Sequence, residues 1–119
     1  MTTHEIAKQL VILCRQGKFE EAQNEFFSKD VISIEPHATP AFEKETKGLS
    51  AILAKGKKFN QMVKEYHKIE MSEPIEAVNS FAATLRMELT MKEGGHMDMT
   101  ELCVYDVKDG KIVAEHFYM

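Results

Sequence analysis

Residues 81–92 alternate between an apolar row and a mostly polar row. The apolar members are Phe81, Ala83, Leu85, Met87, Leu89 and Met91. Because successive side chains of a strand point to opposite faces, this pattern predicts a long strand with one buried face. Glu93-Gly94-Gly95 interrupts the run, and Asp109-Gly110 interrupts the chain again after Val107. Glycine reaches the positive φ angles that tight hairpins need. Residues 81–119 are therefore predicted to form three antiparallel strands, whose apolar face the first half of the chain must cover.

The remaining elements are predicted from caps, periodicity and breakers. Thr2 and Glu5 have the spacing of a capping box before a helix that ends at Gly17, and a second helix is predicted to end near Lys29-Asp30. A short strand over 31–35 stops at Pro36, and residues 37–47 form a loop. The third helix begins at Gly48 and has an apolar face that reaches Val63. Strands follow over 66–72 and from Ile75, the latter running unbroken into the long strands.

Helices gathered before an antiparallel sheet predict an α+β fold with the helices on one face. A chain of 119 residues is expected to form one domain. A strongly curved sheet with helices on its concave side leaves a cavity, which is where a small ligand is expected to bind.

Charge and composition exclude several classes of partner. The net charge of −4 argues against nucleic acid, because phosphate binding needs a basic stripe. Lysines do cluster, but no aromatic row alternates with them, and we interpret the cluster as a solvated helix face. Its members are Lys55, Lys57, Lys58 and Lys64. No apolar run approaches the roughly 20 residues that cross a membrane, and the polar start of the chain is unlike a signal peptide.

The cysteines and histidines indicate neither a disulfide framework nor a metal site. Cys14 and Cys103 lie far apart and are expected to be small buried residues, which favours a reduced, cytoplasmic location. The histidines share no zinc-binding spacing, so no metal is expected. They are His4, His37, His67, His96 and His116.

Three stretches in this order resemble the nuclear-transport-factor-two-like superfamily, the cone-shaped fold of ketosteroid isomerase and the SnoaL-like polyketide cyclases. The first is Arg15-Gln16-Gly17-Lys18-Phe19. The second runs from Phe27-Ser28-Lys29-Asp30-Val31 through Ile34-Glu35-Pro36 to Gly48-Leu49-Ser50-Ala51-Ile52. The third is the hairpin Tyr105–Val113 with Asp109-Gly110-Lys111-Ile112 at its centre. The resemblance implies one cystatin-like cone over residues 1–119. In it, a curved antiparallel sheet is covered on its concave face by three helices from the N-terminal half. A homodimer through the outer sheet face is also implied.

Glu35 and Glu101 are the candidate catalytic residues. By resemblance, Glu35 stands where ketosteroid isomerase keeps a carboxylate base that removes a proton beside a carbonyl; the alternative is a solvated glutamate at a strand end. Glu101 shares a strand face with Met97, Met99 and Cys103. If that face is inward, burial would favour its neutral form, which by resemblance donates a hydrogen bond to an enolate oxygen. If the face is outward, Glu101 is a surface charge or a dimer contact.

Further residues are candidates for contact with a ligand. Glu115 is a third possible carboxylate of the pocket, unless it points outward and His116 inward. The methionines either fill the core or form an adaptable wall for a flat apolar ligand. His37, in the loop near Glu35, either orients a ligand or is solvated. The predicted ligand-binding residues are His37, Met87, Met99, Cys103, Tyr105, Glu115 and Phe117.

Two differences from the family argue against a mechanism identical to that of these relatives. Leu10 stands where the isomerase has a tyrosine donor on its first helix, and Phe117 stands where the epoxide-opening relatives have an aspartate. Two hypotheses remain. One is a cofactor-free isomerase or cyclase acting on an apolar cyclic carbonyl compound, and the other is a non-catalytic ligand-binding or association module of the same fold.

Overall fold

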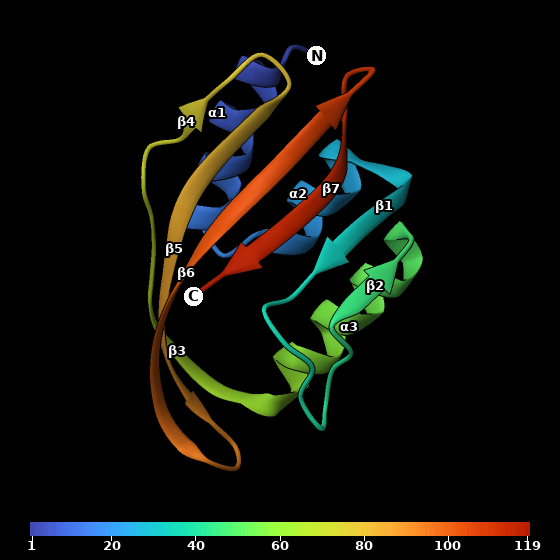
Figure 1. Cartoon of the computed structure of the whole chain (residues 1–119). Coiled ribbons are helices and arrows are strands. Elements are labelled where there is room, and N and C mark those ends of the chain that lie inside the picture. The colour runs from blue at the N-terminus through green and yellow to red at the C-terminus, as the bar shows by residue number, and fades with distance from the viewer.

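The computed structural model describes all residues, 1–119, and shows three helices on one side of a curved sheet (Figure 1). The helices are α1 (Thr3–Arg15), α2 (Phe19–Phe26) and α3 (Leu49–Met62). The strands are β1 (Phe27–Ile34), β2 (Glu45–Lys47), β3 (Val63–Met71), β4 (Ile75–Glu76), β5 (Ser80–Met91), β6 (Gly95–Lys108) and β7 (Lys111–Tyr118). None of the helices is long and apolar enough to cross a membrane.

The three predicted C-terminal strands are confirmed. β5 and β6 pair antiparallel over their length, from Ser80 opposite Asp106 to Met91 opposite Gly95, and β6 then pairs antiparallel with β7. Both turns use left-handed backbone, with φ of 98° and 75° at Gly94 and Gly95, and 52° and 76° at Asp109 and Gly110. The turn residues therefore supply the conformations on which the prediction depended.

The sheet as a whole is mixed, which corrects the expectation of an antiparallel one. The strand order is β2-β1-β7-β6-β5-β3, with β4 paired to β5, and β1 runs parallel to β7. A parallel pair needs a long crossover rather than a hairpin, and here the chain between the two strands contains α3 and the other five strands. The α+β arrangement and the helix-covered concave face are confirmed.

Several predicted boundaries were wrong. α2 ends at Phe26, and β1 begins at Phe27, whose side chain is buried in the core. Val63 begins β3 instead of extending the third helix, and residues 45–47 of the expected loop form β2, which pairs with β1. β4 is a short strand separated from β5 by a turn in which the Ala77 N–H donates to the Ser80 carbonyl. In each case burial or pairing with distant residues overrode the local pattern.

α1 supplies much of the core beneath the sheet. The capping box is present, because the Thr2 side chain accepts from the Glu5 N–H while the Glu5 carboxylate accepts from the Thr2 N–H. One stripe of the helix is buried: Ile6, Ala7, Leu10, Val11 and Cys14. In Figure 1 this helix lies behind the long strands, on the face opposite the viewer.

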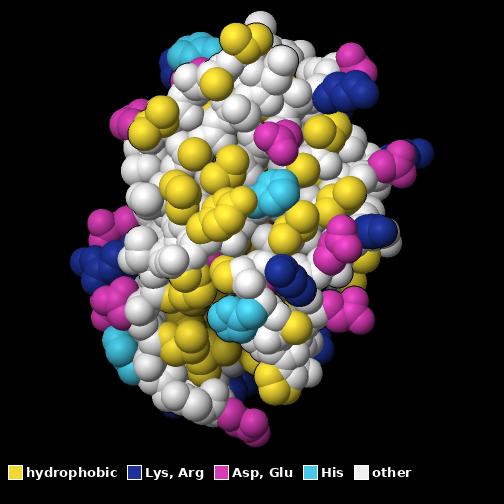
Figure 2. All heavy atoms as spheres, in the orientation of Figure 1, with side chains coloured by type: hydrophobic (Ala, Val, Ile, Leu, Met, Phe, Trp, Pro, Cys, Tyr) yellow, Lys and Arg dark blue, Asp and Glu magenta, His cyan; other side chains and the backbone are white.

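The outer face of the sheet has an apolar region and a charged region. Figure 2 shows hydrophobic side chains gathered over the strands that face the viewer. The pairing places side chains of four neighbouring strands in one outward row: Ile34, His116, Val104 and Ala82. Beside this row, Leu102 is 40% exposed and Tyr118 is 53% exposed.

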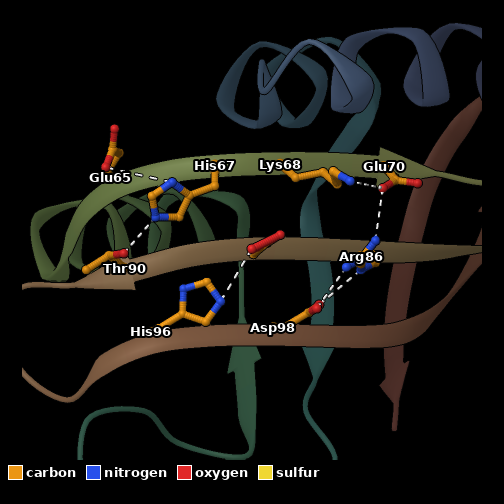
Figure 3. Close-up of polar contacts among 9 residues, drawn as sticks. Glu65, His67, Lys68, Glu70, Arg86, Thr90, His96 and Asp98 are labelled. Carbon is orange, nitrogen blue, oxygen red and sulfur yellow. Dashed lines mark hydrogen bonds and ion pairs between the residues drawn. The ribbon is translucent and has the colours of Figure 1, made fainter.

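The charged region lies on β3, β5 and β6, where Arg86 joins two acidic residues (Figure 3). Its guanidinium donates to Asp98 Oδ2 at 2.8 Å and to Glu70 Oε1 at 3.1 Å. Nearby, the rings of His67 and His96 lie 5.8 Å apart. Such exposed pairs contribute little to stability one by one, and they keep this end of the sheet polar.

Candidate functional site

A cavity of about 290 Å³ lies between the concave face of the sheet and the helices. Its walls come from all three helices, from β1 and the segment that follows it, and from β3, β5, β6 and β7. Most of the lining is apolar and includes Phe19, Phe27, Ile52, Leu85 and Phe59. Cavities of this size and lining accommodate small organic molecules.

The structure brings together all of the predicted site residues except one. Lining the cavity are Glu35, His37, Met87, Met99, Glu101, Tyr105, Glu115 and Phe117. Cys103 is the exception, because its side chain is fully buried within the wall and does not line the cavity. Burial raises the pKa of its thiol, and Cys103 packs within the wall behind the lining residues.

Glu101 points into the cavity from β6. Its neighbour Leu102 is on the outer face, which decides the orientation that the sequence left open. Burial raises the pKa of Glu101 to about 7, with a further contribution from the negative charges of Glu35 and Glu115, while Lys55 acts in the opposite direction. A carboxyl group with such a pKa is partly neutral near pH 7 and donates a hydrogen bond in that form.

Glu115 is the most deeply buried carboxyl group of the site. Its side chain on β7 points inward, leaving the residue 4% exposed, and its Oε1 accepts a hydrogen bond from Ser33 Oγ at 2.8 Å. Burial raises the pKa of Glu115 to about 7, although the Ser33 hydrogen bond and the Lys55 charge both lower it. Its neighbour His116 is on the outer face and lies 3.8 Å from the Asp106 carboxylate.

Lys55 is the functional residue that the sequence interpretation missed. Its Nζ donates to Ser33 Oγ at 3.1 Å and to Glu35 Oε1 at 3.3 Å, and its side chain is only 19% exposed. The lysine lies three residues after Ile52, which is fully buried, so both face the cavity side of α3. That i, i+3 spacing was the available signal, but the flanking lysines Lys57 and Lys58 masked it.

The segment after β1 covers one side of the cavity. Lys58 donates to the Ala41 carbonyl and lies 5.0 Å from the centre of the Phe42 ring, which in turn lies 6.5 Å from the Phe59 ring. Phe42 therefore anchors this segment against α3. Figure 2 shows hydrophobic side chains in the hollow between this segment and the β5–β6 hairpin.

The cavity wall holds no activated nucleophile. The pKa of the Cys14 thiol is raised by burial to about 12, and the pKa of Tyr105 is also raised well above its usual value by burial. The Tyr105 ring stacks on Phe81 with their centroids 4.8 Å apart. Leu10 lines the α1 side of the cavity, where it offers no hydrogen-bond donor. The carboxyl groups that line the cavity are therefore its candidates for acid–base chemistry.

The sequence profile of the SnoaL-like domain matches residues 1–119. This chain belongs to the SnoaL-like domain family. A crystal structure from Mesorhizobium loti, named as a candidate SnoaL-like polyketide cyclase with the further words carbohydrate phosphatase, is 31% identical; the match covers all of both chains with a TM-score of 0.90. No curated protein matches this SnoaL-like chain.

More distant structures share the fold of this SnoaL-like domain. An NTF2-like protein of unknown function from Burkholderia pseudomallei is 13% identical, with a TM-score of 0.76 over 96% of this chain and 90% of its own. TerC, crystallised with polyporic acid, is also 13% identical, with a TM-score of 0.77 over 96% of this chain and 91% of its own. The family and the NTF2-like fold predicted from the sequence are confirmed.

Proposed function

We propose that this SnoaL-like domain is a cofactor-free isomerase or cyclase that moves a proton next to a carbonyl group of an apolar cyclic compound. Glu35 acts as the general base, and neutral Glu101 donates a hydrogen bond to the oxygen on which charge develops. The observation that carries the proposal is that these two carboxyl groups face one apolar cavity, Glu35 from just after β1 and Glu101 from β6, with the pKa of Glu101 raised to about 7. A carboxyl group whose pKa lies near 7 is suited to exchanging a proton near neutral pH.

The remaining lining residues hold the substrate in this proposal. Met87, Met99 and Phe117 contact its apolar ring system, and His37 lies where its polar end would emerge. The names of two structural neighbours support this substrate class. The M. loti protein is named as a candidate polyketide cyclase, and TerC was crystallised with an organic acid.

Binding of phenols with graded pKa values tests the oxyanion site, because a phenolate imitates an enolate. A ligand at 100 times its dissociation constant adds about 2.7 kcal/mol to stability, which raises the melting temperature by several degrees. We expect stabilisation that varies with phenol pKa and is lost in Glu101→Leu. Glu88→Leu, on the outer face, is the control, and this variant should still be stabilised by phenols. Equal stabilisation by all phenols, with or without Glu101, would remove Glu101 from the mechanism.

A specific contact also favours a second function, non-catalytic ligand binding. Glu35 is already paired with Lys55, and Leu10 provides no second donor to an oxyanion. Glu35→Gln separates the two functions. The enzyme proposal predicts loss of turnover with ligand binding retained, whereas a binding module would show unchanged binding and no turnover in either protein.

We also propose that the domain forms a homodimer through the apolar region of its outer sheet face. The row of Ile34, His116, Val104 and Ala82, with Leu102 beside it, crosses four strands without a fixed charge. A cytoplasmic location is proposed from Cys14 and Cys103, which are both buried and unpaired, as is usual for a reducing compartment.

A further inference from the structure

The acid–base pair described above leaves one buried carboxyl group without a role. Glu115 is only 4% exposed and lines the cavity, and polar side chains from two other elements, Ser33 on β1 and Lys55 on α3, also connect it to Glu35. Ser33 is itself 0% exposed. Burying a hydroxyl group between an ammonium and a carboxylate destabilises the fold unless every polar group of the network has a hydrogen-bond partner. This condition is met, because no buried polar side-chain atom of the protein lacks a partner.

The hydrogen bonds form one connected chain, in which Lys55 donates both to Ser33 and to Glu35. Lys55 Nζ lies 3.3 Å from Glu35 Oε1 and 3.1 Å from Ser33 Oγ, and the Ser33 hydroxyl donates to Glu115 Oε1 at 2.8 Å. Glu35 lines the cavity at one end of the chain, and Glu115 lies at its buried end. Both carboxyl groups therefore share a single ammonium, one directly and one through Ser33.

We propose that Lys55 and Ser33 form a proton relay between Glu35 and Glu115, with Glu115 storing the proton that Glu35 removes from the substrate. The proposal rests on the function proposed above only for the source of that proton. Glu35, Lys55 and Ser33 supply the route, and in this proposal neither Ser33 nor Lys55 touches the substrate.

The transfer balances without any additional reactant. Starting from protonated Glu35, ionised Glu115 and the Lys55 ammonium, the Ser33 O–H bond breaks as its proton joins Glu115. In the same movement an N–H bond of Lys55 breaks to restore the Ser33 hydroxyl, so that no free alkoxide forms, and the neutral Lys55 amine then accepts the proton of Glu35. The result is ionised Glu35, protonated Glu115 and an unchanged ammonium. The reverse sequence returns the proton to the substrate at a different carbon.

Apart from the cavity that Glu115 lines, the hydrogen-bonded chain through Ser33 is its polar connection to Glu35. The groups that face it are Cys14 from α1, Glu101, Cys103 and Tyr105 from β6, and Glu35 and Lys55 at the cavity. The thiols and the phenol have raised pKa values because of burial, so they remain protonated near pH 7. Glu115, whose pKa is about 7, is suited to gain and lose a proton in that range.

The test is the rate at which Glu115 exchanges its proton, measured on the ligand-free protein by ¹³C NMR of the glutamate carboxyl groups. The Glu115 resonance is assigned by its absence in Glu115→Gln. In the wild type, we expect one narrow resonance that moves with pH, because the relay gives fast exchange. In Ser33→Ala, we expect severalfold slower exchange and a resonance broadened at the midpoint of titration. Ser33→Thr, which keeps the hydroxyl group, should restore the narrow line.

Lys55→Met provides a second interruption of the chain and should slow exchange as Ser33→Ala does. Lys58→Met changes a lysine on the same helix that is not part of the hydrogen-bonded relay. It should leave the rate of proton exchange at Glu115 unchanged. Fast exchange in both Ser33→Ala and Lys55→Met, with amide spectra that show intact folds, would overturn the relay. Because no substrate is used, a failed phenol test with slowed exchange in Ser33→Ala would refute the proposed enzyme activity while supporting the relay.

Discussion

Glu115 and Glu101 are carboxyl groups whose burial costs stability when they ionise. In the folded chain each has a pKa of about 7, compared with an ordinary value of 4.5. Between these two pH values the folded state holds protons that the unfolded chain has released. The free energy of unfolding therefore falls as pH rises from about 4.5 to about 7 and levels off above that range.

Glu115→Gln should reduce this dependence, because the amide cannot ionise. A shift from 4.5 to about 7 corresponds to at most about 3 kcal/mol. We expect the variant to gain stability relative to the wild type as pH rises from 4.5 to 8, measured by chemical denaturation at each pH. Glu43→Gln, at an exposed position, is the control. Parallel stability curves for wild type and Glu115→Gln would show that Glu115 is not the buried titrating group.

The sequence predicted these carboxyl groups as candidates, but it did not predict what holds them. Alternation along 97–105 placed Glu101 on one face with Cys103, and a chemical argument followed for either orientation. Lys55 was missed although its spacing from Ile52 was a signal, because its role depends on contacts with Ser33 on β1 and with Glu35 just after it. A lysine in a basic cluster is solvated by default, and only the packing of α3 against β1 places this one in the cavity.

Among the secondary elements, the β6–β7 hairpin has the most demanding turn. Gly110 has φ of 76°, and a Cβ there would lie 3.3 Å from the Met1 nitrogen. Gly110→Ala should destabilise the protein by about 1–2 kcal/mol, since an L-residue in left-handed backbone costs that much. The change would be measured as a shift in the denaturation midpoint.

The same substitution at Gly56 should have the opposite effect on stability. It lies inside α3, and a Cβ there would have no atom within 4 Å. Gly56→Ala should therefore stabilise the protein by up to about 1 kcal/mol, because alanine is the better helix former. Because Gly56 lines the cavity, the added methyl group should also weaken binding of bulky phenols. Equal effects of the two substitutions would show that the turn conformation is not responsible for the effect of Gly110→Ala.

The predicted elements were correct where one residue pattern covered a whole element and wrong where two elements adjoin. The alternating pattern of β5 predicted which of its side chains are buried, because every second side chain enters the core. Phe27 and Val63 follow helices without an intervening breaker, so nothing local marked the change from helix to strand. Their burial, which depends on the completed sheet, fixes both boundaries.

At the scale of the whole molecule, the apolar outer face predicts self-association. Leu102→Asp should convert the proposed dimer into a monomer, because a charge would be buried in the contact. Sedimentation velocity at micromolar concentration measures this directly. Lys8→Glu, on α1 at the opposite face, should remain dimeric. A wild-type protein that sediments as a monomer would contradict the dimer.

The curved α+β architecture followed from the order of helices and strands, together with the resemblance of three short motifs to the family. The parallel pairing of β1 with β7 did not follow, because no sequence pattern marks which distant strand becomes a neighbour. This pairing places Ser33 opposite Glu115, and the buried end of the site depends on it.

That pairing also has a consequence for the order in which the molecule can assemble during translation. β7 is the seventh strand to be synthesised, yet it lies between β1 and β6 in the sheet. Until it leaves the ribosome, β1 and β2 have no partner that joins them to the other strands. Folding therefore has to wait for the segment that carries Glu115. A ribosome stalled before residue 111 would display a chain that chaperones recognise.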